Sequence, residues 1–281
     1  MRGLAHWEEL RSGDSGELIL AVDTPPRGPA PSDFRELIPL LDTRHTVWRA
    51  TESDRTHPRG TCLDEYIAPW TDEVRAAGLR VRAVLGYGVG GIFAGAIADG
   101  VGRDQGRTPE VLLFDPELVD SGTVVDEFRR LVSTVSHSLT GRALERLERE
   151  SAALLADAGA DDDAGALAIG LHGVLSQAIG DEPERVGSVA GMAGQALGLA
   201  TARLSSLAIA DAVNVVPLWS AGTALCSSSP DSGLNRTRSV LLLPDAALVG
   251  REILFEDRHA EVLRSTTVAR MASELLGSSD A

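Results

Sequence analysis

The chain has 281 residues, 43% hydrophobic and 24% charged, and its 41 acidic and 26 basic residues give a formal net charge of −15. A surface this acidic repels phosphate backbones, which argues against a nucleic-acid partner. Apart from histidine, every basic residue is arginine, which excludes Schiff-base chemistry on a lysine.

The first half of the chain predicts strands that alternate with helices. A helix is expected from Asp33, with Ser32 as its N-cap and Pro39 as an interruption. A second helix closes at Gly78, a residue suited to the left-handed end of a helix. The expected strands cover 18–22, 45–50, 81–85 and 110–115, and a helix of small residues covers 92–100.

The second half of the chain changes character at about residue 123. From there to about 210 it is rich in Ala, Leu and Arg with helical spacing and has no strand signal. In the rest of the chain, the alternation of strands and helices predicts an α/β fold with a mostly parallel sheet and helices on both faces. We interpret the chain as a single domain, 1–281, with a helical lid at about 123–210. The later strands are expected at 213–219, 240–243 and 252–255, and a closing helix at about 260–276.

The cysteines and apolar runs bear on compartment and metals. Cys62 and Cys226 lie far apart and in no metal-ligand spacing, which predicts a reducing, cytoplasmic environment and no metal or cofactor. The N-terminus lacks the apolar core of a signal peptide, and no apolar stretch is long enough to span a membrane. The acidic run 161–163 lacks the Gly and distal Glu of a calcium loop, so we interpret it as a solvated turn.

A glycine-rich turn follows the strand at 81–85. Residues 86–91 read Gly-Tyr-Gly-Val-Gly-Gly and lead into the helix of small residues. In this setting G-x-S-x-G marks a nucleophile elbow, and the central position here is Gly88. Two other interpretations stay open. One is that the turn cradles a dinucleotide phosphate, although its spacing departs from G-x-G-x-x-G, and the other is that it only packs a helix on a sheet.

With Gly88 in the serine position, the turn resembles the elbow of the thioesterases of polyketide and nonribosomal peptide biosynthesis. A following strand that ends in an acid, a helical insert and a late histidine add to this resemblance, which covers roughly residues 17–276. It implies the α/β-hydrolase fold and a polyketide or peptide intermediate as partner, free or tethered to a carrier protein. It also implies a homodimer, for which the sequence carries no interface signal.

The same resemblance implies the site residues. Asp115, at the end of the following strand, stands where the triad acid is expected, and His259 stands where the histidine is expected. Asp231 is the rival acid. The oxyanion hole is assigned to the backbone N–H groups of Val89 and Thr24.

Several other residues are weighed for chemistry. Cys226 or one of the serines at 227–229 is a candidate for a relocated nucleophile. Among the remaining histidines, His137 and His172 fall in the predicted lid and are candidates to face a pocket.

Without a hydroxyl at position 88, no acyl-enzyme can form there. We therefore expect a thioesterase-like enzyme in which His259, oriented by Asp115, acts as general base for cyclisation or another non-covalent transformation. The alternative is a catalytically inactive thioesterase homologue that binds a carrier protein or an acyl chain. A third explanation is that Gly88 was engineered from serine.

Overall fold

The computed structural model describes residues 5–23, 32–51, 60–157, 163–180, 192–240 and 247–277. The chain forms two compact units. The first takes in 1–51, 63–118 and 213–281, and the second takes in 52–62 and 119–212. All seven described strands belong to the first unit.

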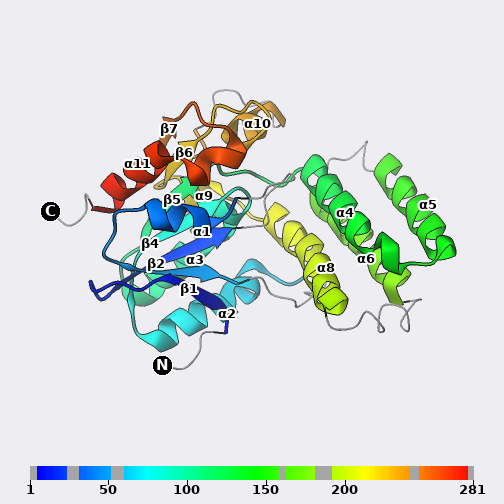
Figure 1. The fold of residues 1–281 in the computed structure, drawn as a ribbon, viewed down its shortest axis with the longest axis horizontal. Coiled ribbons are helices and arrows are strands. Elements are labelled where there is room, and N and C mark those ends of the chain that lie inside the picture. The colour runs from blue at the N-terminus through cyan, green and yellow to red at the C-terminus, as the bar shows by residue number, and fades with distance from the viewer. Residues whose placement is uncertain are drawn as a thin grey trace. The chain divides into compact units, whose positions relative to one another are not determined.

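The first unit is built on one seven-stranded sheet (Figure 1). The strand order is β1-β3-β2-β4-β5-β6-β7, and every neighbouring pair is parallel except β1 with β3. This confirms the predicted mostly parallel α/β sheet. The strands are β1 Trp7–Arg11, β2 Glu17–Asp23, β3 Thr46–Ala50, β4 Arg80–Tyr87, β5 Glu110–Phe114, β6 Thr223–Cys226 and β7 Arg251–Leu254.

Helices cover both faces of the sheet (Figure 1). On one face the buried core joins strand residues such as Leu85 and Phe114 to Phe34 and Leu263 of the covering helices. On the other face, α3, Gly90–Gln105, lies directly against β4. The first face carries α1 Phe34–Leu37, the 3-10 helices Ile38–Leu40 and His259–Arg264, and α11 Thr266–Gly277; the second carries α2 Leu63–Ala77, α3 Gly90–Gln105 and α9 Val216–Trp219.

The start of α1 corrects one prediction. The N-cap is Asp33, whose Oδ1 accepts the Arg35 N–H at 2.8 Å, and not Ser32, which is fully buried. The expected interruption at Pro39 is confirmed, because α1 ends at Leu37 and a short 3-10 helix follows. A proline ring lacks the N–H that a continuing helix needs.

The second unit consists of helices, and its described residues contain no strand. This unit contains the segment that is predicted to form a lid, and the lid role stays a prediction. Helix α6, Ala164–Gly180, begins directly after the acidic turn and is capped by Asp163, whose Oδ1 accepts the Ala166 N–H at 2.7 Å. Residues 161 and 162 lie outside the described part. The helices are α4 Ser121–Val135, α5 Gly141–Asp157, α6 Ala164–Gly180 and α8 Met192–Asp211.

One strand prediction after the predicted lid needs correction, and another falls almost entirely outside the described residues. The apolar run 213–219 is not a strand, because Asn214 accepts the Val216 N–H and Pro217 occupies the first turn of α9. Its place in the sheet is taken by β6, Thr223–Cys226. Val240 ends α10, Gly233–Val240, and 241–243 lie outside the described residues. The strand expected at 252–255 is confirmed as β7.

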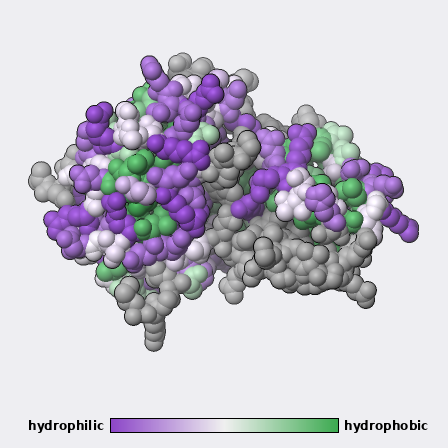
Figure 2. Space-filling model, viewed as in Figure 1, coloured by the Kyte–Doolittle hydropathy of each residue, from purple (hydrophilic) through white to green (hydrophobic). Residues whose placement is uncertain are grey.

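The visible face of the described surface is mainly hydrophilic, with small hydrophobic areas (Figure 2). Among the described residues, the large hydrophobic side chains that are exposed are Leu40, Val216 and Leu254. The same parts of the chain contain no helix long and apolar enough to cross a membrane.

Candidate active site

The glycine-rich turn forms a sharp elbow between β4 and α3. Gly88 has φ +55°, in the left-handed region. Its N–H donates to Phe114 O at the end of β5 (3.1 Å), and its carbonyl accepts the N–H groups of Gly91 (3.0 Å) and Glu117 (3.2 Å). These bonds tie the elbow to the carboxyl end of the neighbouring strand.

Gly86 and Gly88 of the elbow differ in what an added side chain would meet. A Cβ on Gly86 would lie 2.6 Å from Gly91 Cα and 2.7 Å from Ala94 Cβ, so the close packing of α3 on β4 excludes a side chain there. Among the described residues, no heavy atom lies within 4 Å of a Cβ built on Gly88. Helix packing therefore explains why residue 86 is glycine. Position 88, in contrast, has room for a side chain among the described residues, and its backbone conformation is that of an elbow.

The predicted acid lies beside this elbow. Asp115 directly follows β5, and it is the one non-glycine residue of the described chain with a left-handed φ, 45°. Its side chain is 1% exposed and accepts the Ser227 N–H (3.0 Å), the Ser227 hydroxyl (2.8 Å) and the Ser232 hydroxyl (3.2 Å). Backbone strain of this kind concentrates at functional sites, where surrounding contacts hold it.

The predicted histidine binds this carboxylate. His259 Nδ1 lies 2.6 Å from Asp115 Oδ2, although 144 residues separate them in the chain. When Nδ1 donates its proton to a carboxylate, Nε2 of the neutral ring is left as an acceptor. The imidazole is thereby prepared to take a proton through Nε2. The rival acid, Asp231, is exposed and does not bind His259.

The two predicted oxyanion donors have different outcomes. Thr24 lies outside the described residues. Val89 is the N-cap of the 16-residue helix α3, and within the described chain its N–H makes no hydrogen bond. A free N–H at the positive end of a helix dipole can stabilise an anion.

The residues considered as relocated nucleophiles are engaged elsewhere. Cys226 is 2% exposed, and this burial raises the pKa of its thiol. Ser227 donates to Asp115, Ser228 donates to Glu256 O (3.0 Å), and Ser229 accepts the His259 backbone N–H (3.0 Å). None of these contacts joins a nucleophile to the imidazole ring.

The burial of Cys226 leads to a simple prediction. We expect a thiol reagent at pH 8 to modify the exposed Cys62 quickly and to reach Cys226 only after unfolding, because the thiolate is the reactive form. Titration in native buffer should therefore count one thiol, and titration in denaturant two. Equal rates for both cysteines in the folded protein would contradict the assignment.

The remaining candidates lie in the second unit. His137 lies in the 3-10 helix Ser136–Ser138, and His172 lies in α6 with Nε2 3.4 Å from the Ser176 hydroxyl. In the described ranges no three His, Cys, Asp or Glu side chains gather in a way that suits a metal ion.

Comparison with known proteins bears on the fold. No protein-family model and no curated protein matches the chain. Among solved structures, holo-AB3403, a four-domain nonribosomal peptide synthetase bound to AMP and glycine, matches with a TM-score of 0.57 and 12% identity. A hydrolase from Pseudomonas aeruginosa PA01 matches with a TM-score of 0.50 and 12% identity, over 96% of this chain and 92% of that one. The chain has the α/β-hydrolase fold.

The extent of these matches differs. The synthetase match covers 96% of this chain, which spans only 20% of the synthetase. The Vlm2 thioesterase domain, bound with a dodecadepsipeptide, matches with a TM-score of 0.49 and 15% identity over 98% of this chain and 97% of that one. In the fold of this chain, the glycine-rich turn follows a central strand of the sheet, which is the position of an elbow.

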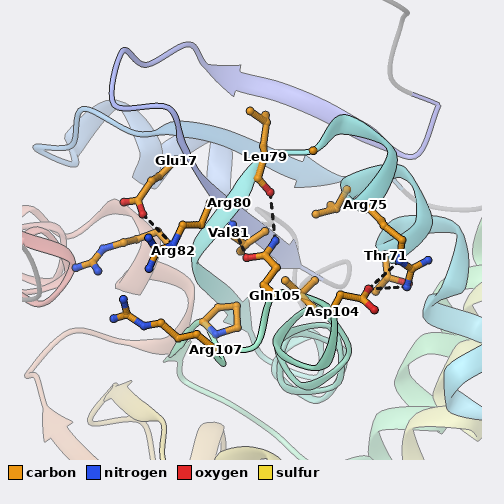
Figure 3. Close-up of a pocket in the computed structure, with 14 residues that line it drawn as sticks. Glu17, Thr71, Arg75, Leu79, Arg80, Val81, Arg82, Asp104, Gln105 and Arg107 are labelled. Atoms are coloured by element: carbon orange, nitrogen blue, oxygen red, sulfur yellow. Dashed lines mark hydrogen bonds and ion pairs between the residues drawn. The ribbon is translucent and has the colours of Figure 1, made fainter.

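A second feature, a pocket of about 470 Å³, lies at the opposite ends of the strands (Figure 3). Arginines line it at the start of β4, in α2 and just after the end of α3, but three of them already face acids. An anion would have to displace those partners, so we assign the pocket no ligand. The pairs are Arg75–Asp104 (2.6 Å), Arg80–Glu17 (3.4 Å) and Arg82–Glu110 (4.0 Å).

The residues that hold the acid are not evident from the sequence. Ser227 is predicted there only as a nucleophile, and nothing in the sequence singles out Ser232 or Gly233. Gly233 has φ +59°, and a Cβ there would lie 2.1 Å from Asp115 Oδ1, so the carboxylate rests against bare backbone. The small residues around these positions predict a turn, but they do not indicate that the turn contacts Asp115.

Proposed function

We propose that the chain is a thioesterase-like enzyme of polyketide or nonribosomal peptide biosynthesis that acts without a serine nucleophile. His259, oriented by Asp115, serves as general base for cyclisation or another non-covalent transformation of a polyketide or peptide intermediate.

One observation carries this proposal. The 2.6 Å bond between His259 Nδ1 and Asp115 Oδ2 lies beside an elbow whose central residue, as far as the described residues go, has open space in place of a side chain. Tyr87, which directly precedes Gly88, stacks on the His259 ring, so base and elbow belong to one cluster. A substrate group can enter the volume that a serine hydroxyl would occupy.

The proposed reaction conserves atoms and charge. A hydroxyl or amine of the substrate attacks the substrate's own thioester carbonyl, and His259 Nε2 takes the proton from the attacking oxygen or nitrogen as the bond forms. The Val89 N–H stabilises the developing oxyanion. Collapse of the intermediate expels the thiolate, which takes the proton from the imidazolium. The products are a ring and a free thiol.

The size of each contribution can be stated. A positioned general base contributes about 10²–10⁴-fold to the rate. Each oxyanion donor contributes about 10²–10³-fold. Intramolecular attack supplies the proximity that a covalent enzyme obtains by first binding the acyl group.

The substrate class is proposed from the resemblance of the elbow and from the fold. The structural likeness to a nonribosomal peptide synthetase supports an intermediate of that kind. A carrier-tethered substrate and a free thioester fit the proposed chemistry equally, because both present the same carbonyl and leaving thiolate.

The test compares wild-type protein with His259→Ala on N-acetylcysteamine thioesters that carry a distal hydroxyl or amine. We expect mass spectrometry to find cyclic product with the wild type and a loss of about 10²–10⁴-fold in rate with His259→Ala. His6→Ala is the matched control, because His6 is half-exposed and pairs with Glu73. Full turnover by His259→Ala would refute the base role.

The absence of an Oγ at position 88 also favours a second candidate function, an inactive homologue that binds a carrier protein or an acyl chain. If the protein has this binding role, neither the wild type nor His259→Ala will accelerate the reaction of any thioester above its uncatalysed rate. Binding of an acylated carrier protein by both proteins, without product, would then favour the binding role.

A further inference from the structure

The His259 side chain has a second neighbour besides Asp115. The Tyr87 ring stacks on the imidazole with centroids 5.0 Å apart and planes 18° from parallel. The Tyr87 hydroxyl donates to the His259 backbone carbonyl at 3.1 Å. One side chain therefore holds both the ring and the backbone of the same histidine.

Tyr87 is itself fixed in place. It is the last residue of β4, is 1% exposed and pairs with Phe114 of β5 in the sheet register. Burial raises the pKa of its phenol, so the hydroxyl stays protonated and remains a donor over the working pH range. Its main chain continues directly into Gly88.

The other contacts of His259 with described residues leave the ring plane one freedom, which Tyr87 limits. Asp115 holds Nδ1, and the Ser229 hydroxyl accepts the backbone N–H at 3.0 Å. A single hydrogen bond at Nδ1 fixes the position of one ring atom but lets the ring plane swing about that bond. A flat ring stacked on the imidazole limits this swing, and with it the direction in which Nε2 points.

We propose that Tyr87 is a positioning residue that sets the plane of the His259 imidazole and so directs Nε2 toward the open space beside Gly88. The inference rests on the proposed role of His259 as a base. Tyr87 touches no reacting atom; it acts through the histidine. Its place directly before Gly88 means that base and elbow move as one piece.

Substitutions at position 87 separate the stacking face from the hydroxyl. Phe keeps the flat face and loses the donor, whereas Leu and Met fill space but offer neither. The matched control is Tyr66→Leu, because Tyr66 is the only other tyrosine of the chain and packs against Trp70 and Phe93 of the same unit. It removes an aromatic ring of equal size away from His259.

The first measurement is the NMR resonance of the Nδ1 proton of His259 in ¹⁵N-histidine-labelled protein, assigned by its loss in His259→Ala. A proton shared with a carboxylate and shielded from exchange gives a resolved low-field signal. We expect wild type, Tyr87→Phe and Tyr66→Leu to keep the signal, and Tyr87→Leu and Tyr87→Met to lose it through exchange. If either folded non-aromatic variant keeps the signal at native intensity, the inference is overturned.

The second measurement uses a Gly88→Ser background, in which a fluorophosphonate reports on the base without a known substrate. We expect Tyr87→Leu to lower the labelling rate about 10²-fold, the loss typical of a catalytic group misplaced by 1 Å, and Tyr87→Phe to lower it less than about tenfold. Equal rates with Leu and Tyr at position 87 would overturn the inference.

The two measurements separate this inference from the proposed function. If the Nδ1 signal depends on Tyr87 as expected, but His259→Ala retains wild-type turnover on thioesters, the positioning stands and the proposed function fails. If the signal is independent of Tyr87 while His259→Ala is inactive, the proposed function stands and the positioning fails.

Discussion

Replacing Gly88 with serine will make the protein react covalently with a fluorophosphonate. The substituted side chain enters open space at a left-handed elbow, beside a histidine already bound to Asp115. The serine Oγ attacks phosphorus, fluoride leaves, and His259 Nε2 takes the hydroxyl proton. Intact-mass spectrometry should show one added phosphonyl group, mapped by peptide digestion to position 88, and none on the wild type.

A matched control isolates the role of the histidine. Gly106 has φ +68° and equally open surroundings at the end of α3, so Gly106→Ser introduces a serine with the same backbone strain and no base. Each substitution should cost about 1 kcal/mol of stability, because a side chain is placed at positive φ. Only Gly88→Ser should be labelled.

Removing the base from the Gly88→Ser protein completes this test. Adding His259→Ala should lower the labelling rate by about 10⁴-fold or more, since the members of such a triad act as a unit. A folded Gly88→Ser protein that resists labelling would show that His259 does not serve position 88.

Gly233→Ala is expected to produce the largest loss of stability among single-atom additions near the site. Its Cβ would lie 2.1 Å from Asp115 Oδ1, and the same residue has a left-handed φ of 59°. Overpacking and backbone strain together should lower the free energy of unfolding by about 2–4 kcal/mol. Urea unfolding measures this loss.

The control for Gly233→Ala separates crowding from backbone strain. Gly78 has φ +66° and nothing within 4 Å of its would-be Cβ, so Gly78→Ala carries the strain alone. The difference between the two variants is the cost of displacing the Asp115 carboxylate. Equal losses in both would contradict the close contact between Gly233 and Asp115.

Much of the fold could be predicted because it is encoded locally. The apolar runs that became β2, β3, β4 and β5, and the helix break at Pro39, follow from residues that are close neighbours in sequence. The strand prediction for 213–219 was wrong because apolar residues suit a strand or a helix equally, and here Asn214 and Pro217 set the first turn of α9. Strand β1 was missed because its sequence, WEELR, is mostly polar.

The residues of the candidate site likewise divide into those that the sequence predicts and those that it does not. The turn around Gly88 was recognisable because an elbow needs glycine at fixed spacing after a strand, and Asp115 because it ends the next strand. Ser227, Ser232 and Gly233 could not be assigned as partners of Asp115, since more than a hundred residues separate them from it and no local pattern links them.

The sequence by itself determined the alternation of strands and helices, the elbow with a glycine at its centre, and the candidates for acid and base. Only the tertiary structure decided between Asp115 and Asp231 as the partner of His259. The physical reason is that β4 and β5 run parallel and side by side, so their carboxyl ends place Gly88 and Asp115 at one edge of the sheet. The chain then has to return from β7 to bring His259 to that edge, and local residue patterns do not encode such long-range pairing.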